Sequence, residues 1–375
     1  MPIYKITGKK KDGLQKYQVK VNFTDSTGKH RQVMRTAYGA QAAKELEREL
    51  LNKIKEEASP SCPPPKMTTD DLFQVYISYI SNEVRRSSTE KKQQIYSHHI
   101  QPYMGDVLLS ELDVKTLQGW KNYMYQKNFK LHTMKNCYKE LRAMINYALR
   151  VGYISSNPLV HVGDFKDAYR GKVEMDFYTA EEFRQYKTAL LQYAQESNKY
   201  DYYVFFCLAY YTGARKGEIH ALRWKNYNGV NISIEKSISQ KLTGGDVETP
   251  PKTPSSIRKV QLPTPLIEIL NDHKERQKKI ISDWNEEGFI CGYYKPLRDT
   301  QIDLENRKIA QAAELKRIRI HDFRHSHASL LINANISPLE VAHRLGHATV
   351  DQTLKTYSHL FPAESDKSLS LLNQI

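Results

Sequence analysis

Basic, imidazole and phenol side chains gather toward the C-terminal end of the 375-residue chain. His321, Arg324 and His325 are spaced i, i+3 and i+4, so a helix would carry all three on one face. His347 lies in a turn after the next expected helix, and Tyr357 lies in the helix that follows. Imidazoles transfer protons or bind metal ions, guanidinium groups bind anionic oxygens, and an activated phenol is a nucleophile. These residue types therefore permit metal binding, anion binding or covalent chemistry.

The same residues, taken one at a time, also have structural interpretations. Tyr357 is one of 25 tyrosines and shares an apolar helix face with Val350 and Leu354, which by itself favours a place in the core. A metal site is disfavoured because the HExxH pattern is absent and the Arg324 guanidinium would repel a dication near His321. Two short capped helices joined by a glycine would also fit a helix-turn-helix that reads DNA without catalysis.

Five short motifs follow one another in the C-terminal half of the chain. In order they are Thr212-Gly213-Ala214-Arg215-Lys216-Gly217-Glu218 running into Ala221-Leu222-Arg223-Trp224, then Pro251-Lys252-Thr253-Pro254-Ser255-Ser256, His321-Asp322-Phe323-Arg324-His325, Leu345-Gly346-His347 and Thr356-Tyr357-Ser358-His359. Together they resemble the motifs of the tyrosine recombinases of the phage-integrase type. Each motif is short, but the shared order makes a chance match improbable. The resemblance replaces the core interpretation of Tyr357 with a catalytic one.

The resemblance implies that a tyrosine hydroxyl cleaves a DNA strand and stays joined to it through a 3′-phosphotyrosyl bond. Tyr357 would be the nucleophile, and Arg215 and Arg324 would bind the non-bridging phosphate oxygens in place of a metal ion. A phenol with a reference pKa of ~10 is mostly neutral at pH 7, so it needs a base or a cationic field. Glu218 either orients Arg215 or supports the fold. No nucleotide cofactor is expected, in keeping with the absence of a P-loop motif.

Three further residues would handle protons and the phosphate in this scheme. By analogy with the family, His321 helps to accept the phenolic proton and His347 forms a hydrogen bond to the phosphate. Lys252 would protonate the departing 5′ oxygen as general acid. Lys241 and Lys259 lie in the same strand-and-turn region and are alternatives for that acid.

Composition and charge agree with a partner that is a polyanion. Lys plus Arg number 56 and Asp plus Glu 42, which gives a net charge of +14. Nucleic acid is the first candidate and an anionic membrane surface the second. The chain has no apolar run long enough to span a membrane, no hydrophobic signal segment at its start and no CxxC pair among its four cysteines. We therefore expect a DNA-associated protein of a prokaryotic cytoplasm, without metal or other cofactor.

The first residues concentrate the positive charge. Residues 1–40 have a net charge of +7, half of the excess of the whole chain. Alternating apolar residues predict a strand over 15–23, and a return strand is expected over 32–36 after a turn. A helix is expected over 40–54, which is rich in Ala, Glu and Leu. We interpret residues 1–60 as an arm-type DNA-binding module, although a solvated basic arm without contacts would look similar. Its candidate phosphate contacts are Lys9, Lys10, Lys11, Lys20 and Arg31.

A proline-rich linker at 60–65 precedes a helical domain over 66–162. Thr68 can cap a first helix there, and a later helix that starts near Thr133 ends at a glycine. The resemblance identifies this domain with a core-binding domain. Among its exposed lysines, we select Lys91 and Lys92 as candidate DNA contacts, with solvated surface charge as the equal alternative.

The third domain, over 174–375, begins with a predicted capping box formed by Thr179 and Glu182. Residues 202–211 are apolar on every side, which predicts a buried helix, and alternating isoleucine, valine and leucine residues after it predict a small antiparallel sheet. The apolar chain end packs on its own domain or docks on a neighbouring protomer. The expected fold class is α+β multidomain: a small strand-plus-helix module, a helical domain, and a mostly helical catalytic domain with a small antiparallel sheet.

These observations predict a site-specific DNA recombinase that integrates or excises a mobile element. Its expected partners are double-stranded DNA, at core and arm sequences of the attachment site, and other copies of itself in a tetramer on DNA. The resemblance also allows for an accessory DNA-bending or excision protein, and no membrane partner is expected. The rival hypotheses are a DNA-binding regulator without catalysis and a relaxing topoisomerase of related chemistry.

Overall fold

The computed structural model describes most of the chain, in six stretches: residues 3–6, 14–24, 30–58, 66–166, 175–251 and 253–358. The chain divides into two compact units, residues 1–170 and 171–375. Within the described stretches, no helix is both long enough and apolar enough to cross a membrane.

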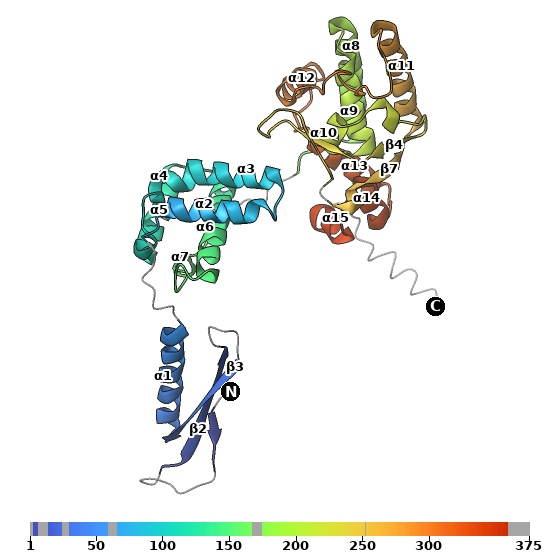
Figure 1. Ribbon diagram of the computed structural model, residues 1–375. Helices are drawn as coiled ribbons and strands as arrows, with labels where there is room; N and C mark the ends of the chain where they lie inside the picture. Colours follow the sequence, from blue (N-terminus) through green and yellow to red (C-terminus); the bar gives the residue numbers. More distant parts are fainter. Residues whose placement is uncertain are drawn as a thin grey trace, which may run out of the picture. The chain divides into compact units, whose positions relative to one another are not determined.

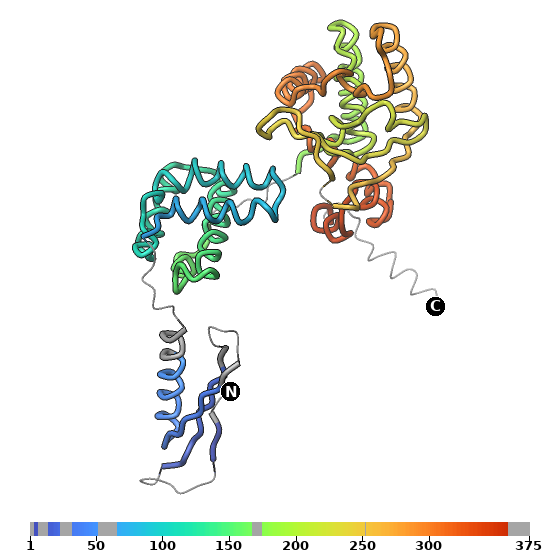
Figure 2. The backbone as a smooth tube through the Cα atoms, in the orientation of Figure 1, coloured from blue at the N-terminus to red at the C-terminus, as the bar shows by residue number. Residues whose placement is uncertain are grey.

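The start of the first unit is a three-stranded antiparallel sheet with one helix beside it (Figure 1). Its elements are β1 (Ile3–Lys5), β2 (Lys16–Thr24), β3 (His30–Tyr38) and α1 (Ala40–Ala58). Val19, Val21 and Ala37 form the small core together with Ala43 of α1. The predicted strand, strand and helix are therefore confirmed, while β1 was not predicted because three residues carry no readable periodicity. Figure 2 follows the backbone through this part.

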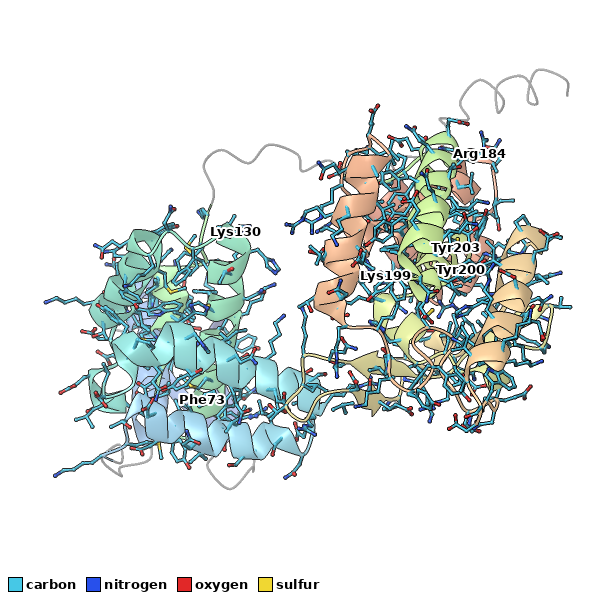
Figure 3. The ribbon with its side chains drawn as sticks, turned by 90° about the horizontal axis from the view of Figure 1, so that it is seen from above. Phe73, Lys130, Arg184, Lys199, Tyr200 and Tyr203 are labelled. Atoms are coloured by element: carbon cyan, nitrogen blue, oxygen red, sulfur yellow. The ribbon has the colours of Figure 1, made fainter. Side chains whose placement is uncertain are left out.

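The rest of the first unit is helical. Its helices are α2 (Thr69–Ser81), α3 (Arg86–Ile95), α4 (Gln101–Met104), α5 (Val114–Gln126), α6 (Leu131–Arg150) and α7 (Leu159–Val162). The predicted cap at Thr68 is present, since its side chain accepts a hydrogen bond from Asp71 N. Phe73, labelled in Figure 3, stacks on Tyr96 with ring centroids 3.7 Å apart. The apolar faces of these helices close around one core of their own.

The second unit is mostly helical and carries two small sheets. Its helices are α8 (Ala180–Ser197), α9 (Tyr200–Thr212), α10 (Lys216–His220), α11 (Thr264–Ile280), α12 (Asp299–Ala312), α13 (Asp322–Asn333), α14 (Pro338–Leu345) and α15 (Val350–Tyr357). Its strands are β4 (Asn231–Ile234), β5 (Ser237–Ser239), β6 (Val247–Thr249) and β7 (Arg258–Gln261). The expected capping box of Thr179 and Glu182 opens α8.

Helix α9 is the centre of this unit, as its continuous apolar sequence predicts. Val204, Phe205 and Phe206 are fully buried, and the helix packs against α8, α11 and α13. Figure 3 labels Tyr200 and Tyr203 on this helix. Because α9 is buried along its length, its C-terminal end lies at a fixed place in the core, directly before the first arginine motif.

The predicted antiparallel sheet is present, divided into two pairs of strands. β4 pairs with β7, so that Ile232 lies opposite Val260. Ile238, which continues the same alternating pattern, belongs to the separate pair of β5 and β6. The turn between β5 and β6 carries Lys241.

Candidate active site

Arg324 is a buried cation with an unused donor. It lies in the first turn of α13 and is 3% exposed. Its Nη1 donates a hydrogen bond of 2.8 Å to the carbonyl of Gly213, whereas Nη2 is buried and has no partner among the described residues. Burial first, and then the positive charge of Arg215, lower the pKa of Arg324 to about 9. A buried guanidinium with a vacant N–H is costly unless an acceptor binds it, so this site favours an anion.

The end of α9 fixes that arginine. Gly213 has φ +63°, and a Cβ there would lie 2.7 Å from the His327 ring and 2.8 Å from Leu345. Only glycine fits this position, both for its backbone conformation and for the close approach. The chain can therefore reverse at Gly213, present its carbonyl to Arg324 and place the next arginine in the same pocket.

Arg215 is held by Glu218, three residues further along. The Glu218 carboxylate accepts hydrogen bonds from Arg215 N at 2.9 Å and from Arg215 Nη1 at 2.8 Å. Glu218 is buried, and burial alone would raise its pKa, but the charges of Arg258 and Arg215 outweigh this and lower it. The two roles considered for Glu218 are thus both present in its contacts, because the same carboxylate orients Arg215 and pairs with a core arginine.

That core arginine, Arg258, was not found from the sequence. It lies on β7 with its side chain 1% exposed and donates to Glu218 Oε2 at 2.9 Å. Its Nε donates to the carbonyl of Arg344 at 2.8 Å and its Nη1 to that of Ser256 at 3.1 Å. It joins β7, the arginine motif and the end of α14. The available signal was a charged residue at an inward position of a predicted strand, which is rare without a buried partner.

Tyr357 lies inside the same unit and not on an exposed arm. It ends α15, is 1% exposed, and packs with Ala328, Ile332 and Val341. Burial raises its pKa to about 12, and the positive charges of Arg324 and Arg215 act against that rise. The nucleophile predicted from the sequence is therefore within the electrostatic reach of both arginines of its own chain.

A histidine that the sequence analysis did not assign makes the contact with this tyrosine. His325 Nδ1 lies 2.7 Å from Tyr357 Oη, a hydrogen-bond distance. His321, the residue expected to take part in proton transfer, has its ring centroid 5.0 Å from that of His325. The i, i+4 spacing placed the two histidines side by side, but no pattern in the sequence showed which of them reaches the phenol.

His321 and His347 border the arginines. Burial and then the charge of Arg324 lower the pKa of His321, and the same causes in the same order lower that of His347 to about 4. His347 Nδ1 lies 2.7 Å from Thr353 Oγ1. In the absence of an anion, both rings are thus neutral at pH 7, and His347 is anchored to α15.

Two of the three candidate general acids lie in the described part of the chain. Lys252 falls outside the described residues. Lys241 is exposed in the turn between β5 and β6, and Lys259 is exposed on β7, where it pairs with Ser233. All three remain predictions for the acid.

The predicted DNA contacts differ in their surroundings. Lys20 lies on β2 and Lys91 is exposed on α3. Lys92 instead forms an ion pair of 2.5 Å with the buried Glu140 and donates to Tyr76 Oη at 3.3 Å, so its charge stabilises the helical domain. Lys9, Lys10, Lys11 and the Arg31 side chain fall outside the described atoms. Among the described side chains, no group of three or more histidine, cysteine or acidic residues could hold a metal ion.

Comparison with known proteins agrees with this geometry. Residues 182–364 match the phage integrase family, and residues 71–166 match the phage integrase SAM-like domain. The chain belongs to the phage integrase family and is a site-specific tyrosine recombinase.

Among curated relatives, the ICEBs1 integrase of Bacillus subtilis is 26% identical over 368 residues, which cover 96% of this chain and 97% of that protein. A tyrosine recombinase XerC-like protein of Caldanaerobacter subterraneus is 25% identical, with 97% of each chain covered. Among solved structures, the Tn1549 transposon integrase bound to transposon right end DNA superposes with a TM-score of 0.65 at 17% identity, covering 82% of this chain and 99% of that one. A lambda integrase dimer bound to a COC′ core site gives 0.55 at 18% identity, with 94% of each chain covered.

Proposed function

We propose that this chain is the integrase of a mobile element, and that it cuts and rejoins attachment-site DNA through a 3′-phosphotyrosyl bond on Tyr357. The observation that carries the proposal is the buried Tyr357 beside Arg324, whose Nη2 is buried and unpaired within the described structure. An anionic phosphate would supply the missing acceptor and would bring phosphorus to the phenol.

The arginines would stabilise the reaction electrostatically. As Tyr357 attacks, negative charge grows on the non-bridging oxygens of phosphorus, and fixed guanidinium groups stabilise this charge without a metal ion. Arg215 and Arg324 are already positioned by Glu218 and Gly213, so little reorganisation accompanies the reaction. With the Thr353 hydroxyl donating to Nδ1, His347 would direct its Nε2–H to the phosphate.

A lysine would protonate the departing 5′ oxygen, and three lysines are candidates: Lys252, Lys241 and Lys259. A substrate with sulfur at the 5′ bridging position has a leaving group that needs no proton. We expect this substrate to restore cleavage by Lys252→Ala and not by Arg215→Ala. If this substrate instead restores cleavage by the Lys241→Ala or the Lys259→Ala variant, that lysine is the general acid.

The first module would bind arm sites through the open face of its sheet. Val19 and Val21 point toward α1, so Lys20, which alternates with them, lies on the opposite face, paired with Met34. On the same face Gln32 donates to Asn22 at 2.8 Å. A β-ribbon fits the major groove of DNA, and amide and ammonium groups read base edges and phosphates there.

The working assembly would be a tetramer on DNA. The solved lambda integrase structures include a tetramer bound to a Holliday junction, which has a TM-score of 0.55 with this chain. Two strand exchanges between two duplexes need four nucleophiles, one for each cut strand. An accessory DNA-bending or excision protein would set the direction of recombination.

The proposal is tested with a duplex that carries the end of the chain's own element and a nick near the cut site. Wild-type protein should accumulate a covalent adduct, because the cut fragment diffuses away. The Tyr357→Phe variant should bind this duplex with unchanged affinity and form no adduct. Adducts that persist in the variant would refute the nucleophile, and a wild-type protein that binds without any adduct would favour a regulator. Relaxation of supercoiled DNA without site preference would indicate a topoisomerase.

A further inference from the structure

A hydrogen bond between α13 and α15 joins Tyr357 to His325, a side chain to which the proposed reaction has so far given no role. His325 follows Arg324 directly, so α13 directs one residue toward the phosphate pocket and the next toward Tyr357. The Nδ1–Oη distance is 2.7 Å. Tyr357 is 1% exposed, which leaves little room for a water molecule to take the proton.

His325 is able to accept a proton in this state. The charged and titratable groups around His325 come from three places in the chain. Its own stretch contributes Arg319, His321, Asp322 and Arg324; α15 contributes Tyr357, and the turn between α14 and α15 contributes His347. Burial, then the charge of His321, lowers the pKa of His325 to about 4, so the ring is neutral at pH 7. The Asp322 carboxylate accepts three hydrogen bonds from Arg319, which hold it in place.

We propose that His325, and not His321, receives the phenolic proton when Tyr357 attacks the scissile phosphate; the inference rests on the function proposed above. The bond from Tyr357 Oη to phosphorus forms while the bond from phosphorus to the 5′ oxygen breaks. The phenolic proton passes to His325 Nδ1, and the 5′ oxygen takes its proton from the general-acid lysine. In rejoining, the 5′ hydroxyl gives its proton to the same lysine as it attacks phosphorus, the bond from phosphorus to Tyr357 Oη breaks, and the imidazolium of His325 returns its proton to the departing phenolate.

Charge balance supports this step. The phenol becomes strongly acidic as its oxygen bonds to phosphorus, so even a weak base takes the proton at that point. The phosphodiester brings a negative charge into the pocket, which offsets the guanidinium charges that disfavour an imidazolium. The proton also moves toward a ring that already lies at hydrogen-bond distance.

The test measures single-turnover adduct formation on the nicked duplex, with Tm and DNA affinity recorded for each variant. We expect His325→Ala to bind DNA normally and to form the adduct at least about 100-fold more slowly, the usual contribution of a general base. Added imidazole should accelerate this variant. His325→Asn keeps an acceptor near the Nδ1 position but cannot take a full proton, so it should stay slow. His343→Ala, which changes an exposed histidine on α14, is the matched control and should react at the wild-type rate.

Several results would overturn the assignment. A His325→Asn variant at the wild-type rate would show that the contact only orients the phenol, and a fast His325→Ala variant would show no role at all. Rescue of His325→Ala by a 5′ bridging sulfur would place its defect on the leaving group. If His321→Ala alone forms the adduct slowly and is accelerated by imidazole, His321 and not His325 accepts the proton. Failure of the wild-type protein to form an adduct would refute the proposed function itself, which separates the two conclusions.

Discussion

The candidate active site and the proposed DNA-binding surfaces of the first unit hold positive charge in different ways. In the pocket, Arg324, Arg258 and Arg215 are held by carbonyls and by one buried carboxylate, so their positions are fixed before any substrate binds. In the first unit, Lys20 and Lys91 lie on the outer side of a sheet and a helix. Fixed charge provides rate enhancement, whereas distributed charge provides affinity that depends on salt.

The largest expected effect comes from removing the buried arginine. Arg324→Ala should lower the rate of adduct formation by roughly 1,000-fold, because it removes both charge and donors from the developing oxyanion. Arg324→Lys keeps the charge but not the planar fork, and should still lose about 100-fold. Single-turnover cleavage measures both rates, with a mobility shift as the control for binding. A lysine variant at the wild-type rate would contradict the need for a bidentate contact.

Glu218→Gln should affect both stability and rate. The change removes the carboxylate from between two guanidinium groups, one of which is buried, and breaking a buried pair costs about 3 kcal/mol or more. We expect a lower Tm together with slower cleavage at saturating DNA. Glu287→Gln is the matched control, since Glu287 pairs with Lys225 at the surface, and its Tm should not change. Equal Tm values for the two variants would show that the Glu218 network is not a structural element.

The histidines of the second unit should make the fold sensitive to acid. Burial and then the charge of Arg344 lower the pKa of His327 to about 3, whereas an unfolded histidine has a pKa of about 6.5. As pH falls below about 6.5, His327 becomes protonated in the unfolded chain but stays neutral in the folded chain. The free energy of unfolding therefore decreases toward pH 4. His327→Gln keeps an acceptor for Arg344 Nε and should make the decrease in Tm shallower. An unchanged slope would assign the acid sensitivity to other groups.

The smallest expected effects distinguish two adjacent lysines. Lys91→Ala should leave Tm unchanged. It should reduce the slope of log Kd against log salt concentration by about 1, the contribution of one phosphate contact. Lys92→Ala should instead lower Tm, because it leaves the buried Glu140 without its cation. The measurements are thermal melts and salt titrations of binding to core-site DNA. Reversed behaviour of the two variants would show that Lys92 faces DNA.

The sequence predicted the fold class and several residues that line the candidate site. It predicted fewer of the contacts between those residues. Periodicity and caps predicted α8, α9 and the strand-plus-helix module, and the motifs predicted Arg215, Arg324 and Tyr357. Arg258 could not be predicted, because its function depends on two partners distant in sequence, the Glu218 carboxylate and the Arg344 carbonyl. For the same reason, the spacing of His321 and His325 predicted that both rings lie on one helix face. It did not predict how α13 packs against α15, which decides that His325 is the ring in contact with Tyr357.

The most direct test of the central claim is the mass-spectrometric identification of the residue joined to DNA. The trapped adduct is digested with a protease and a nuclease, and the modified peptide is sequenced. We predict one nucleotide attached through its 3′ phosphate to Tyr357, and a free 5′ hydroxyl on the other cut end. Attachment to another residue, or through a 5′ phosphate, would contradict the account.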